Sequence, residues 1–378
     1  MVLVGARAAG AATAMLLARA GMSVLVLERD RPGTDTLSTH ALMRCGVSQL
    51  ARWGLLDAVI RAGTPPITTA TFRYAHGDVA IPIKPAGGVA ALYAPRRTVL
   101  DPILVDYATK AGAQVRFKVA ATGLLWDHGR VIGVRTVTRS SRGRRSNSSR
   151  SGDCEAHVYA DLVIGADGRN SLVARLVEAP TTHRAEHTSA FCYAYYACLA
   201  GGGYEWAYRP GAAAGLIPTN SDLTCVFAGG TPGRIGRGGA AALTGVLRAA
   251  SPEMAERLAR ARRCGPVRTF TGQPGYLRRP HGPGWALVGD AGSWKDPISA
   301  HGLTDALRDA ELLAGAIIDR RGAAGLADYE ALRNRLSLPI MRASDEIAAM
   351  GWDEARIQAL LAELNLAMNA ELLAMERA

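Results

Sequence analysis

The chain has 378 residues, of which 48% are hydrophobic, and this length favours two interleaved domains over a single core. No run of 18 apolar residues is present, which argues against a membrane span. The net charge is +11, but five arginines and no acid lie within residues 139–150, without aromatic residues or a DNA-binding motif. We therefore expect a solvated loop there and no nucleic-acid partner.

The six cysteines are scattered without C-x-x-C spacing, which argues against a zinc site, and we expect no bound metal. The same scatter argues against a disulfide scaffold and favours the reducing cytoplasm. Arg7 and Arg19 interrupt any apolar segment near the N-terminus. The first residues are therefore expected to be folded structure rather than a signal peptide.

In chain order, the first elements follow a β-α-β pattern. The apolar runs at residues 2–4 and 23–28 predict buried parallel strands. Between them, AAGAATAMLLARAG predicts a helix that stops at Gly21. Two further helices are expected at residues 41–53 and 97–112.

The middle of the chain predicts strands. Residues 113–138 predict an antiparallel pair with DHGR as its turn, and YADLVIGADG predicts another buried strand. Residues 188–229 alternate in polarity and are rich in aromatics, as half-buried antiparallel strands are. SPEMAERLARARR then predicts a helix capped by its serine, GWALVGDAG a buried strand, and the segment from Gly302 onward more helices. The predicted fold class is α/β, a Rossmann-type nucleotide-binding domain interleaved with an antiparallel-sheet domain and followed by a helical C-terminal tail.

The opening stretch VLVGARAAG carries most of a dinucleotide fingerprint. Gly5 supplies the tight turn and Gly10 the close helix–sheet packing, while Arg7 replaces the usual middle glycine. The helix N-terminus would present N–H groups to a pyrophosphate, and Glu28, 23 residues after Gly5, could accept hydrogen bonds from ribose hydroxyls. On these residues alone, a plain β-α-β unit remains the alternative.

Two later motifs strengthen the nucleotide interpretation. They are LVIGADGRNSLVARL at residues 162–176 and GWALVGDAGSWKDPISAHGLTDALRDAELLA at residues 284–314. In the second, a buried strand delivers Asp290 at its carboxyl end, where ligands of α/β sheets bind. Pro297 ends the loop, and Gly302 opens a helix whose positive end would stabilise negative charge, such as that of a reduced flavin.

Together these motifs resemble the class A flavoprotein monooxygenases, the para-hydroxybenzoate hydroxylase superfamily, over essentially the whole chain. In register with the family's patterns are Asp167, Gly168, Ser171, Gly289, Asp290, Pro297, Gly302, Asp309 and Ala310, with Arg175 one residue late. MRCGVSQL is similar to the family's R-x-G-V-x-x-L stretch, and RTVLD to its R-x-x-L-D helix start. Ser293 and Thr304 depart from the family's histidine and asparagine, which indicates a distinct subgroup.

The resemblance implies an FAD-binding domain built from three parts of the chain. These are residues 1–68, 94–180 and 276–320, with substrate-domain strands at 69–93, a substrate domain at 181–275 and C-terminal helices at 321–378. The residues that it assigns to FAD are Gly5, Ala6, Arg7, Ala9, Gly10, Glu28, Arg29, Arg44, Arg97, Ala121, Asp167, Gly289, Asp290, Pro297, Gly302 and Leu303.

The resemblance also implies a reaction. NAD(P)H would reduce FAD, O2 would form a C4a-hydroperoxide, and one oxygen atom would pass to a small organic substrate, of aromatic or polyketide-like character by analogy. A separate flavin reductase could be a partner, and the oligomeric state is not predicted. A reductase of the geranylgeranyl reductase type is the main alternative. A flavin-dependent halogenase is disfavoured because GAAAGLIP lacks both tryptophans of the halogenase pattern G-W-x-W-x-I-P. A nucleotide-binding protein without enzymatic activity is the remaining alternative.

Few side chains stand out for catalysis, since the flavin carries the difficult chemistry. His301, just before the flavin-facing helix, and His40 are the candidate acid–base residues, although His301 could equally be a loop histidine that bonds backbone. Trp294 and its neighbour Lys295 could shape the entry. Tyr193, Tyr195, Trp294 and Ile217 are the candidate substrate-binding residues. Aromatic residues on such a sheet are also common in cores.

Overall fold

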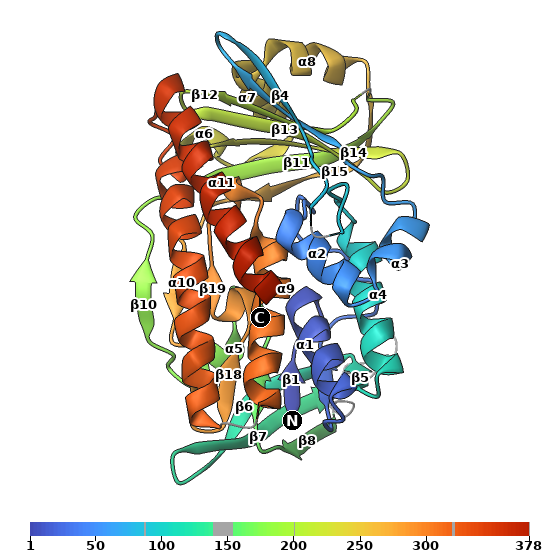
Figure 1. Ribbon diagram of the computed structural model, residues 1–378, viewed down its shortest axis with the longest axis vertical. Coiled ribbons are helices and arrows are strands. Elements are labelled where there is room, and N and C mark those ends of the chain that lie inside the picture. The colour runs from blue at the N-terminus through green and yellow to red at the C-terminus, as the bar shows by residue number, and fades with distance from the viewer. Residues whose placement is uncertain (87, 139–153, 200, 320–321, 378) are drawn as a thin grey trace, which may run out of the picture.

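The computed structural model describes residues 1–86, 88–138, 154–199, 201–319 and 322–377. Its lower half in Figure 1 is organised by a six-stranded sheet in the order β17-β18-β9-β1-β2-β5. All neighbours in this sheet are parallel except the β17–β18 pair. The strands are β17 (His281–Gly282), β18 (Trp285–Leu287), β9 (Val163–Gly165), β1 (Val2–Val4), β2 (Leu25–Glu28) and β5 (Gln114–Phe117).

Both faces of this sheet are buried, which explains why its strands are continuous apolar runs. In β1, Leu3 faces a layer formed by α1 (Ala8–Arg19), α4 (Arg97–Lys110) and α9 (Gly302–Ile318). Val2 and Val4 face the opposite side, toward the sheet of β6 (Val119–Asp127), β7 (Arg130–Thr138) and β8 (Cys154–Tyr159). Gly21 has φ +78° immediately after α1 and ends that helix as predicted.

The upper half is a seven-stranded sheet in the order β15-β11-β14-β13-β12-β3-β4 (Figure 1). Only β12 and β3 pair in parallel. The strands are β15 (Arg262–Phe270), β11 (Ala190–Ala197), β14 (Leu223–Gly230), β13 (Ala212–Thr219), β12 (Tyr204–Arg209), β3 (Thr69–Tyr74) and β4 (Gly77–Pro82). Its outer face packs on α6 (Pro232–Ile235), α7 (Gly239–Ala250) and α8 (Pro252–Ala259), while its inner face joins the core that includes Leu3.

Long helices connect the two halves. α9, α10 (Ala323–Ala348) and α11 (Glu354–Arg377) form the helical tail that the sequence predicts, and α10 and α11 run along one side of the molecule (Figure 1). The remaining elements are α2 (Arg44–Arg52), α3 (Leu56–Arg61), α5 (Leu172–Leu176), the short 3₁₀ helices η1 (Gly289–Ala291) and η2 (Pro297–Ser299), and a small sheet of β10 (Thr181–Arg184), β16 (Tyr276–Arg278) and β19 (Ser293–Trp294).

Two predicted elements differ from the structure. The expected strand pair at residues 113–138 is three strands, because Lys118 takes φ +60° and separates β5 from β6. The helix predicted by SPEMAERLARARR ends at Ala259, and the arginines that follow open β15, where cross-strand pairing with β11 replaces helical bonding. Ser251 does cap α8 by accepting a hydrogen bond from the Met254 N–H. The arginine-rich segment 139–150 lies outside the described residues.

Among the residues described, no helix combines the length and the apolar character needed to cross a membrane.

The close packing of α1 on β1 gives the first testable prediction. A Cβ on Gly10 would come within 2.0 Å of the Gly5 carbonyl oxygen, so Gly10→Ala should destabilise the fold by about 1–3 kcal/mol. Gly245→Ala in α7 is a matched control, because a Cβ there meets open space and alanine favours the helix by about 0.5–1 kcal/mol. Urea unfolding checks both signs, and a Gly10→Ala protein as stable as wild type would contradict the packing argument.

Candidate functional site

The carboxyl ends of β1 and β9 meet at a turn that only glycine can form. Gly5 has φ +105°, and a Cβ there would lie 2.5 Å from the Ala166 carbonyl oxygen. The next residues enter α1, whose N-cap residue Arg7 makes no side-chain capping bond. The N–H groups at the start of α1 are therefore left without a side-chain cap, as an anion-binding helix end requires.

Glu28 lies at the end of β2 beside this helix start. The backbone N–H groups of Ala6 and Asp30 donate to its two carboxylate oxygens over 2.8 and 3.0 Å. The two bonds fix a buried carboxylate that keeps lone pairs for hydroxyl donors. A pocket of about 210 Å³ opens here and is lined by Ala6, Arg7, Glu28, Asp30, Arg31, Pro32, Gly33, Thr34, Asp101, Pro102, Val105, Asp106 and Phe117.

The Arg7 side chain takes a specific place on the rim of this pocket. Its guanidinium lies 3.0 Å from the Asp30 carboxylate, and both side chains are about one-third exposed (30% and 36%). The arginine that replaces the middle glycine of the fingerprint is thus turned toward the acidic end of β2.

Four further residues that the sequence assigns to FAD, three arginines and Ala121, lie in different environments. Arg97, at the start of α4, forms a two-bond ion pair with Asp101 over 2.9 and 3.0 Å. Arg44 opens α2 and donates to the Val89 carbonyl oxygen over 3.3 Å. Arg29 is exposed beyond β2, and Ala121 lies partly buried in β6.

Asp167 follows β9 and caps a helix. Its carboxylate accepts hydrogen bonds from the Ser171 hydroxyl (2.5 Å) and the Leu172 N–H (2.6 Å) at the start of α5. Burial raises the pKa of this carboxyl, and these bonds oppose the rise. The part of Asp167 that faces Gly5 is its Cα, 3.2 Å from where a Gly5 Cβ would stand. Its carboxylate therefore orders the turn beside the site, and direct contact with FAD stays a prediction.

Asp290 lies at the carboxyl end of β18 in η1. Gly289, with φ +60°, allows η1 to approach α1 so closely that a Cβ would lie 2.8 Å from the Ala9 Cβ. Burial raises the pKa of Asp290 from 3.8 to about 6, against the pull of Arg97, Arg169 and Lys295. This half-buried carboxylate accepts no protein hydrogen bond among the described residues, so it is suited to accept bonds from a polyol chain.

The start of α9 completes this edge of the site. Pro297 opens η2, and the segment leads through His301 to Gly302, the exposed first residue of α9. A Cβ on Gly302 would meet no atom within 4 Å, and no side chain caps the helix. Leu303, directly behind it, is buried. The helix end faces open space and offers its N–H groups and partial positive charge to a bound group.

The inner face of the seven-stranded sheet presents the aromatic residues predicted to contact substrate. Tyr195, Cys225 and Ile217 form one row across β11, β14 and β13. Tyr193 and Phe227 form the next row, and the Phe227 ring lies over Gly215, where a Cβ would approach it to 2.3 Å. The tyrosines at 193 and 195 share this face, whereas Tyr196 packs into the outer cluster, as strand alternation requires.

A segment before α2 lies against these tyrosines. The Ser38 N–H donates to the Tyr193 hydroxyl over 3.1 Å. The His40 ring stacks on Tyr195 (5.7 Å between centroids, 9° between planes), and its Nε2 is hydrogen-bonded to the Tyr195 hydroxyl. The backbone of His40 is left-handed, with φ +69°, a costly conformation for a non-glycine residue that is often found at functional sites.

Basic residues surround this His40–Tyr195 pair. The Arg96 guanidinium lies 4.3 Å from the centre of the Tyr195 ring. Burial, reinforced by Arg97, Arg96 and Arg268, holds the pKa of His40 well below its usual range, so the ring is neutral at pH 7. Its buried Nδ1 has no hydrogen-bond partner among the described residues.

Trp294 and His301 occupy different environments in the loop before α9. The half-buried Trp294 ring packs against Phe270, and the Arg169 guanidinium lies 5.7 Å from it. His301 is fully buried, with both ring nitrogens facing carboxylates, which differs from the accessible acid–base residue expected from the sequence. Lys295 is also buried, 2.7 Å from Asp305, instead of shaping an entry.

Three site residues are not found by the sequence reasoning. Arg96 directly precedes the motif arginine, and only its place over Tyr195 distinguishes it. Arg169 follows the Asp-Gly motif, and only the position of its guanidinium over the Phe270 and Trp294 rings shows that its side chain lies beside the loop before α9. Glu371 lies in an ordinary helical stretch, and no spacing connects it with His301.

These features fit FAD. The uncapped start of α1 and the turn at Gly5 suit a pyrophosphate, and the pocket at Glu28 suits the adenosine end. Asp290 suits the ribityl hydroxyls, and the open α9 end suits the polar edge of the ring system.

Asp290 gives a prediction with opposite signs for stability and binding. Because folding raises its pKa to about 6, the ionised carboxyl costs stability as pH rises from about 4 to 6, and this cost persists above pH 6. Asp290→Asn should therefore raise the unfolding temperature of FAD-free protein at pH 8. It should weaken FAD binding by about 10- to 100-fold, since charged hydrogen bonds are worth about 1.5–3 kcal/mol.

Thermal unfolding and FAD titration by fluorescence measure the two effects. The exposed Asp222→Asn serves as a control that should change neither. A variant that binds FAD as tightly as wild type would contradict the role given to Asp290.

Comparison with known proteins agrees with this geometry. Residues 1–344 match a family model described as FAD binding domain. Digeranylgeranylglycerophospholipid reductase 1 of Methanococcoides burtonii is 26% identical over 336 residues, 84% of this chain and 73% of that protein. A second reductase of this name, from Methanopyrus kandleri, is 31% identical over 182 residues, 46% of this chain and 39% of that protein.

Solved structures show the same fold. The flavin-dependent brominase Bmp2 is 18% identical with a TM-score of 0.78 over 100% of this chain and 99% of its own. PqsL, a probable FAD-dependent monooxygenase from Pseudomonas aeruginosa, is 20% identical with a TM-score of 0.77 over 96% and 98%. At these identities the likeness extends to the fold alone. The family model, however, covers most of the chain and agrees with the glycine turn, Glu28 and Asp290, and the chain therefore belongs to the FAD binding domain family.

Proposed function

We propose that this FAD-dependent oxidoreductase is a monooxygenase that acts on a small organic molecule bearing a hydroxyl group on an aromatic or polyketide-like body. The observation that carries the proposal is the neutral His40–Tyr195 pair on the aromatic inner face of the seven-stranded sheet. Tyr195 and Ile217 are at most 5% exposed in the structure. The proposal is that a ring-shaped substrate binds against this apolar face and that the hydrogen-bonding pair acts on one of its polar groups.

The pair has the properties of a proton acceptor. Because His40 is neutral, the tautomer with its proton on Nδ1 leaves the Nε2 lone pair facing the Tyr195 hydroxyl, and Nε2 can take up the proton of that hydroxyl. Burial raises the pKa of Tyr195 far above its usual range, so its hydroxyl stays protonated and passes a proton only in concert with His40. Removing a proton from a substrate hydroxyl makes the attached carbon framework electron-rich, which favours attack by an electrophilic oxygen.

Arg96 and Arg268 support this chemistry electrostatically. Arg96 lies over Tyr195, and both arginines approach the single carboxylate of Asp35, at 3.6 and 2.9 Å. Two guanidinium groups that share one carboxylate leave a local excess of positive charge, which stabilises a deprotonated substrate. When bound, FAD would supply electron transfer and oxygen activation, with NAD(P)H as the proposed source of electrons and O2 as the oxidant.

A reductase is the second candidate, favoured by one observation. Two curated relatives that match most of this chain are named digeranylgeranylglycerophospholipid reductases. Saturating a carbon–carbon double bond needs a hydride equivalent and one proton, and the Tyr195 hydroxyl is the buried donor placed to give that proton. A proton donor and an apolar face serve this reaction as well.

The two candidates differ in their need for oxygen. The FAD-loaded protein is mixed with NADH or NADPH, with and without O2, over a panel of phenols and isoprenoid alkenes. A monooxygenase consumes O2 and reduced nicotinamide together when a phenol is added. Alkene reduction without O2 would instead establish the reductase, and a protein that takes up no FAD would overturn both candidates.

The tyrosine pair allows a matched test within one strand. Tyr195→Phe should lower turnover by about 10²- to 10⁴-fold and leave FAD content unchanged, because proton transfer contributes about that much. His40→Gln should lower turnover similarly. It should also remove the part of the pH dependence of turnover that arises from protonation of His40. Tyr196→Phe is the control, since Tyr196 packs on the outer face. Equal turnover of Tyr195→Phe and Tyr196→Phe would exclude the proposed role.

A further inference from the structure

Beside the start of α9, six ionisable side chains form a buried charge cluster. They are Lys295, His301, Asp305, Arg308, Asp309 and Glu371, and each is at most 6% exposed. Charges so deeply buried are costly unless they are paired, so their arrangement has to satisfy strict electrostatic requirements.

The lysine and the arginine of the cluster are paired closely, and for Lys295 the nearby Asp305 opposes the lowering of its pKa by burial. Asp305 Oδ1 lies 2.7 Å from the Lys295 ammonium and 2.6 Å from the Arg308 guanidinium. Arg308 also lies 2.6 Å from both Asp309 and Glu371. Arg308 also donates to the Ser337 hydroxyl of α10, at 2.8 Å. Two cations face three carboxylates, which leaves one negative charge without a partner unless His301 is charged.

His301 lies where that missing charge belongs. Its Nδ1 is 3.2 Å from Asp305 Oδ1, and its Nε2 is 2.9 Å from Glu371 Oε2. A neutral imidazole carries one N–H, so one of its lone pairs would face a carboxylate. Neither ring nitrogen has an aligned hydrogen bond among the described residues, so the pairing is one of charge. The imidazolium suits both carboxylates, and it brings the cluster to three positive and three negative charges. Glu371 and Asp305 accordingly raise the pKa of His301 to about 9, against the effect of burial.

His301, Asp305 and Glu371 could also be read as the ligands of a metal ion. Asp305 Oδ1, however, already contacts two cations, Lys295 and Arg308. A metal ion at this oxygen would be repelled by both, so an ion-pair cluster is the better description.

The cluster adjoins the flavin end of the site. His301 is the N-cap residue of α9, one residue before the exposed Gly302. The field of the cluster reaches the site, because Asp305 and Lys295 both influence the pKa of Asp290. Other polar groups also face the cluster. The charges of Glu371, Arg308 and Glu311 affect the pKa of the Cys45 thiol on α2, and the Ser337 hydroxyl on α10 accepts a hydrogen bond from Arg308.

Glu371 comes from a distant part of the chain. It lies near the end of α11, which reaches α9 at the centre of the molecule, next to the C-terminus (Figure 1). The helical tail therefore contributes a charge to the surroundings of the flavin site.

We propose that the imidazolium of His301, held between Asp305 and Glu371, is a fixed positive charge that stabilises the negative charge gained by bound flavin on reduction, with Glu371 as its positioning residue. This inference rests on FAD occupying the site described above, but not on which substrate is used. It assigns His301 an electrostatic role in place of the acid–base role expected from the sequence.

The test measures the midpoint potential of bound FAD against pH, without substrate or turnover. In the wild-type protein the potential should fall in an additional step as pH rises through about 9, where His301 loses its proton. In His301→Gln the potential at pH 7 should be lower and the step absent, because the cluster then carries a net negative charge. In Glu371→Gln the step should move to lower pH.

A double variant separates charge from packing. His301→Gln combined with Glu371→Gln leaves two cations and two anions, so the potential at pH 7 should return toward the wild-type value. The double variant also provides a measurement if His301→Gln alone fails to fold. If the cluster only packed α11 against α9, the double variant would be at least as perturbed as either single variant.

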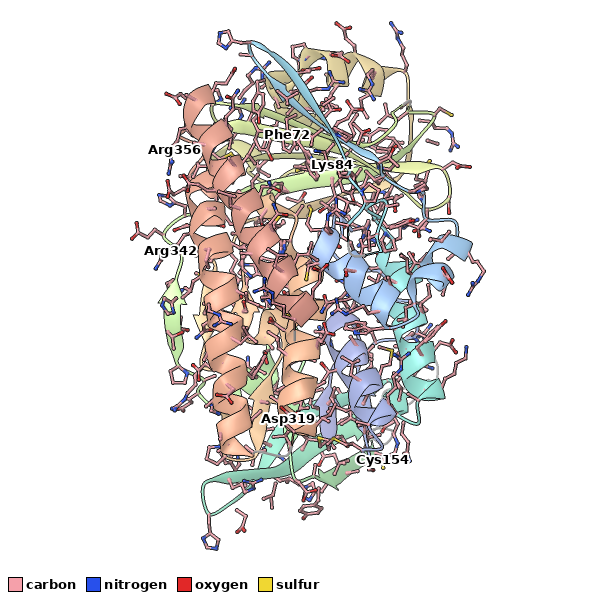
Figure 2. The ribbon with its side chains drawn as sticks, in the orientation of Figure 1. Phe72, Lys84, Cys154, Asp319, Arg342 and Arg356 are labelled. Carbon is pink, nitrogen blue, oxygen red and sulfur yellow. The ribbon has the colours of Figure 1, made fainter. Side chains whose placement is uncertain are left out.

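Glu363→Gln is the matched control. Glu363 lies on the same helix as Glu371 but forms an exposed pair with Arg356, which projects from the outer edge of the helical layer (Figure 2). It should leave the potential and its pH dependence unchanged. Equal potentials for wild type and His301→Gln at pH 7 would overturn this inference alone. A wild-type protein that takes up no FAD would overturn it together with the proposed function.

Discussion

The contact between Gly5 and Ala166 is the constraint on which the rest of the site depends. The turn after β1 passes so close to the chain after β9 that no side chain fits between them. The same approach aligns the carboxyl ends of the parallel strands, which is where Glu28 and Asp290 emerge. The start of α1, Glu28 and Asp290 are thereby brought to the same edge of the sheet by a backbone contact.

The second sheet is attached to this framework through hydrogen bonds as well as through packing. The segment before α4 is held on the sheet by bonds from the Tyr204 hydroxyl to the Tyr93 carbonyl oxygen and from the Thr219 hydroxyl to the Ala94 carbonyl oxygen. This attachment fixes Arg96 over Tyr195 and starts α4 with Arg97, whose charge acts on the pKa of Asp290. One short segment thus places adjacent arginines in two environments, Arg96 on the aromatic face of the second sheet and Arg97 beside Asp101 in α4.

Local patterns in the sequence were sufficient for the parts of the site that depend on backbone geometry. Gly5, Gly10 and the strand that ends at Asp290 are recognisable because steric limits allow few residues there. The alternation on β11 likewise predicted that Tyr193 and Tyr195 share a face. The fold class and the helical tail followed from the same periodicities.

What the sequence could not predict depends on partners far apart in the chain. The pairing of His301 with Glu371 spans 70 positions, and neither residue belongs to a periodic pattern that would connect them. His40 meets Tyr195 only because the segment before α2 crosses the sheet, with a left-handed backbone that no local residue preference indicated. The end of α8 was misplaced because strand pairing with β11 outweighed the helical tendency of the arginines.

The shared core has a thermodynamic consequence. Buried residues of the parallel sheet, the inner face of the seven-stranded sheet and the C-terminal helices belong to one continuous cluster, so neither half can open without exposing the other. Unfolding is then expected to be cooperative across the molecule. A cofactor that contacts mainly the lower half would protect the whole chain from heat and proteases, by about 2.7 kcal/mol at a free concentration of about 100 times its Kd.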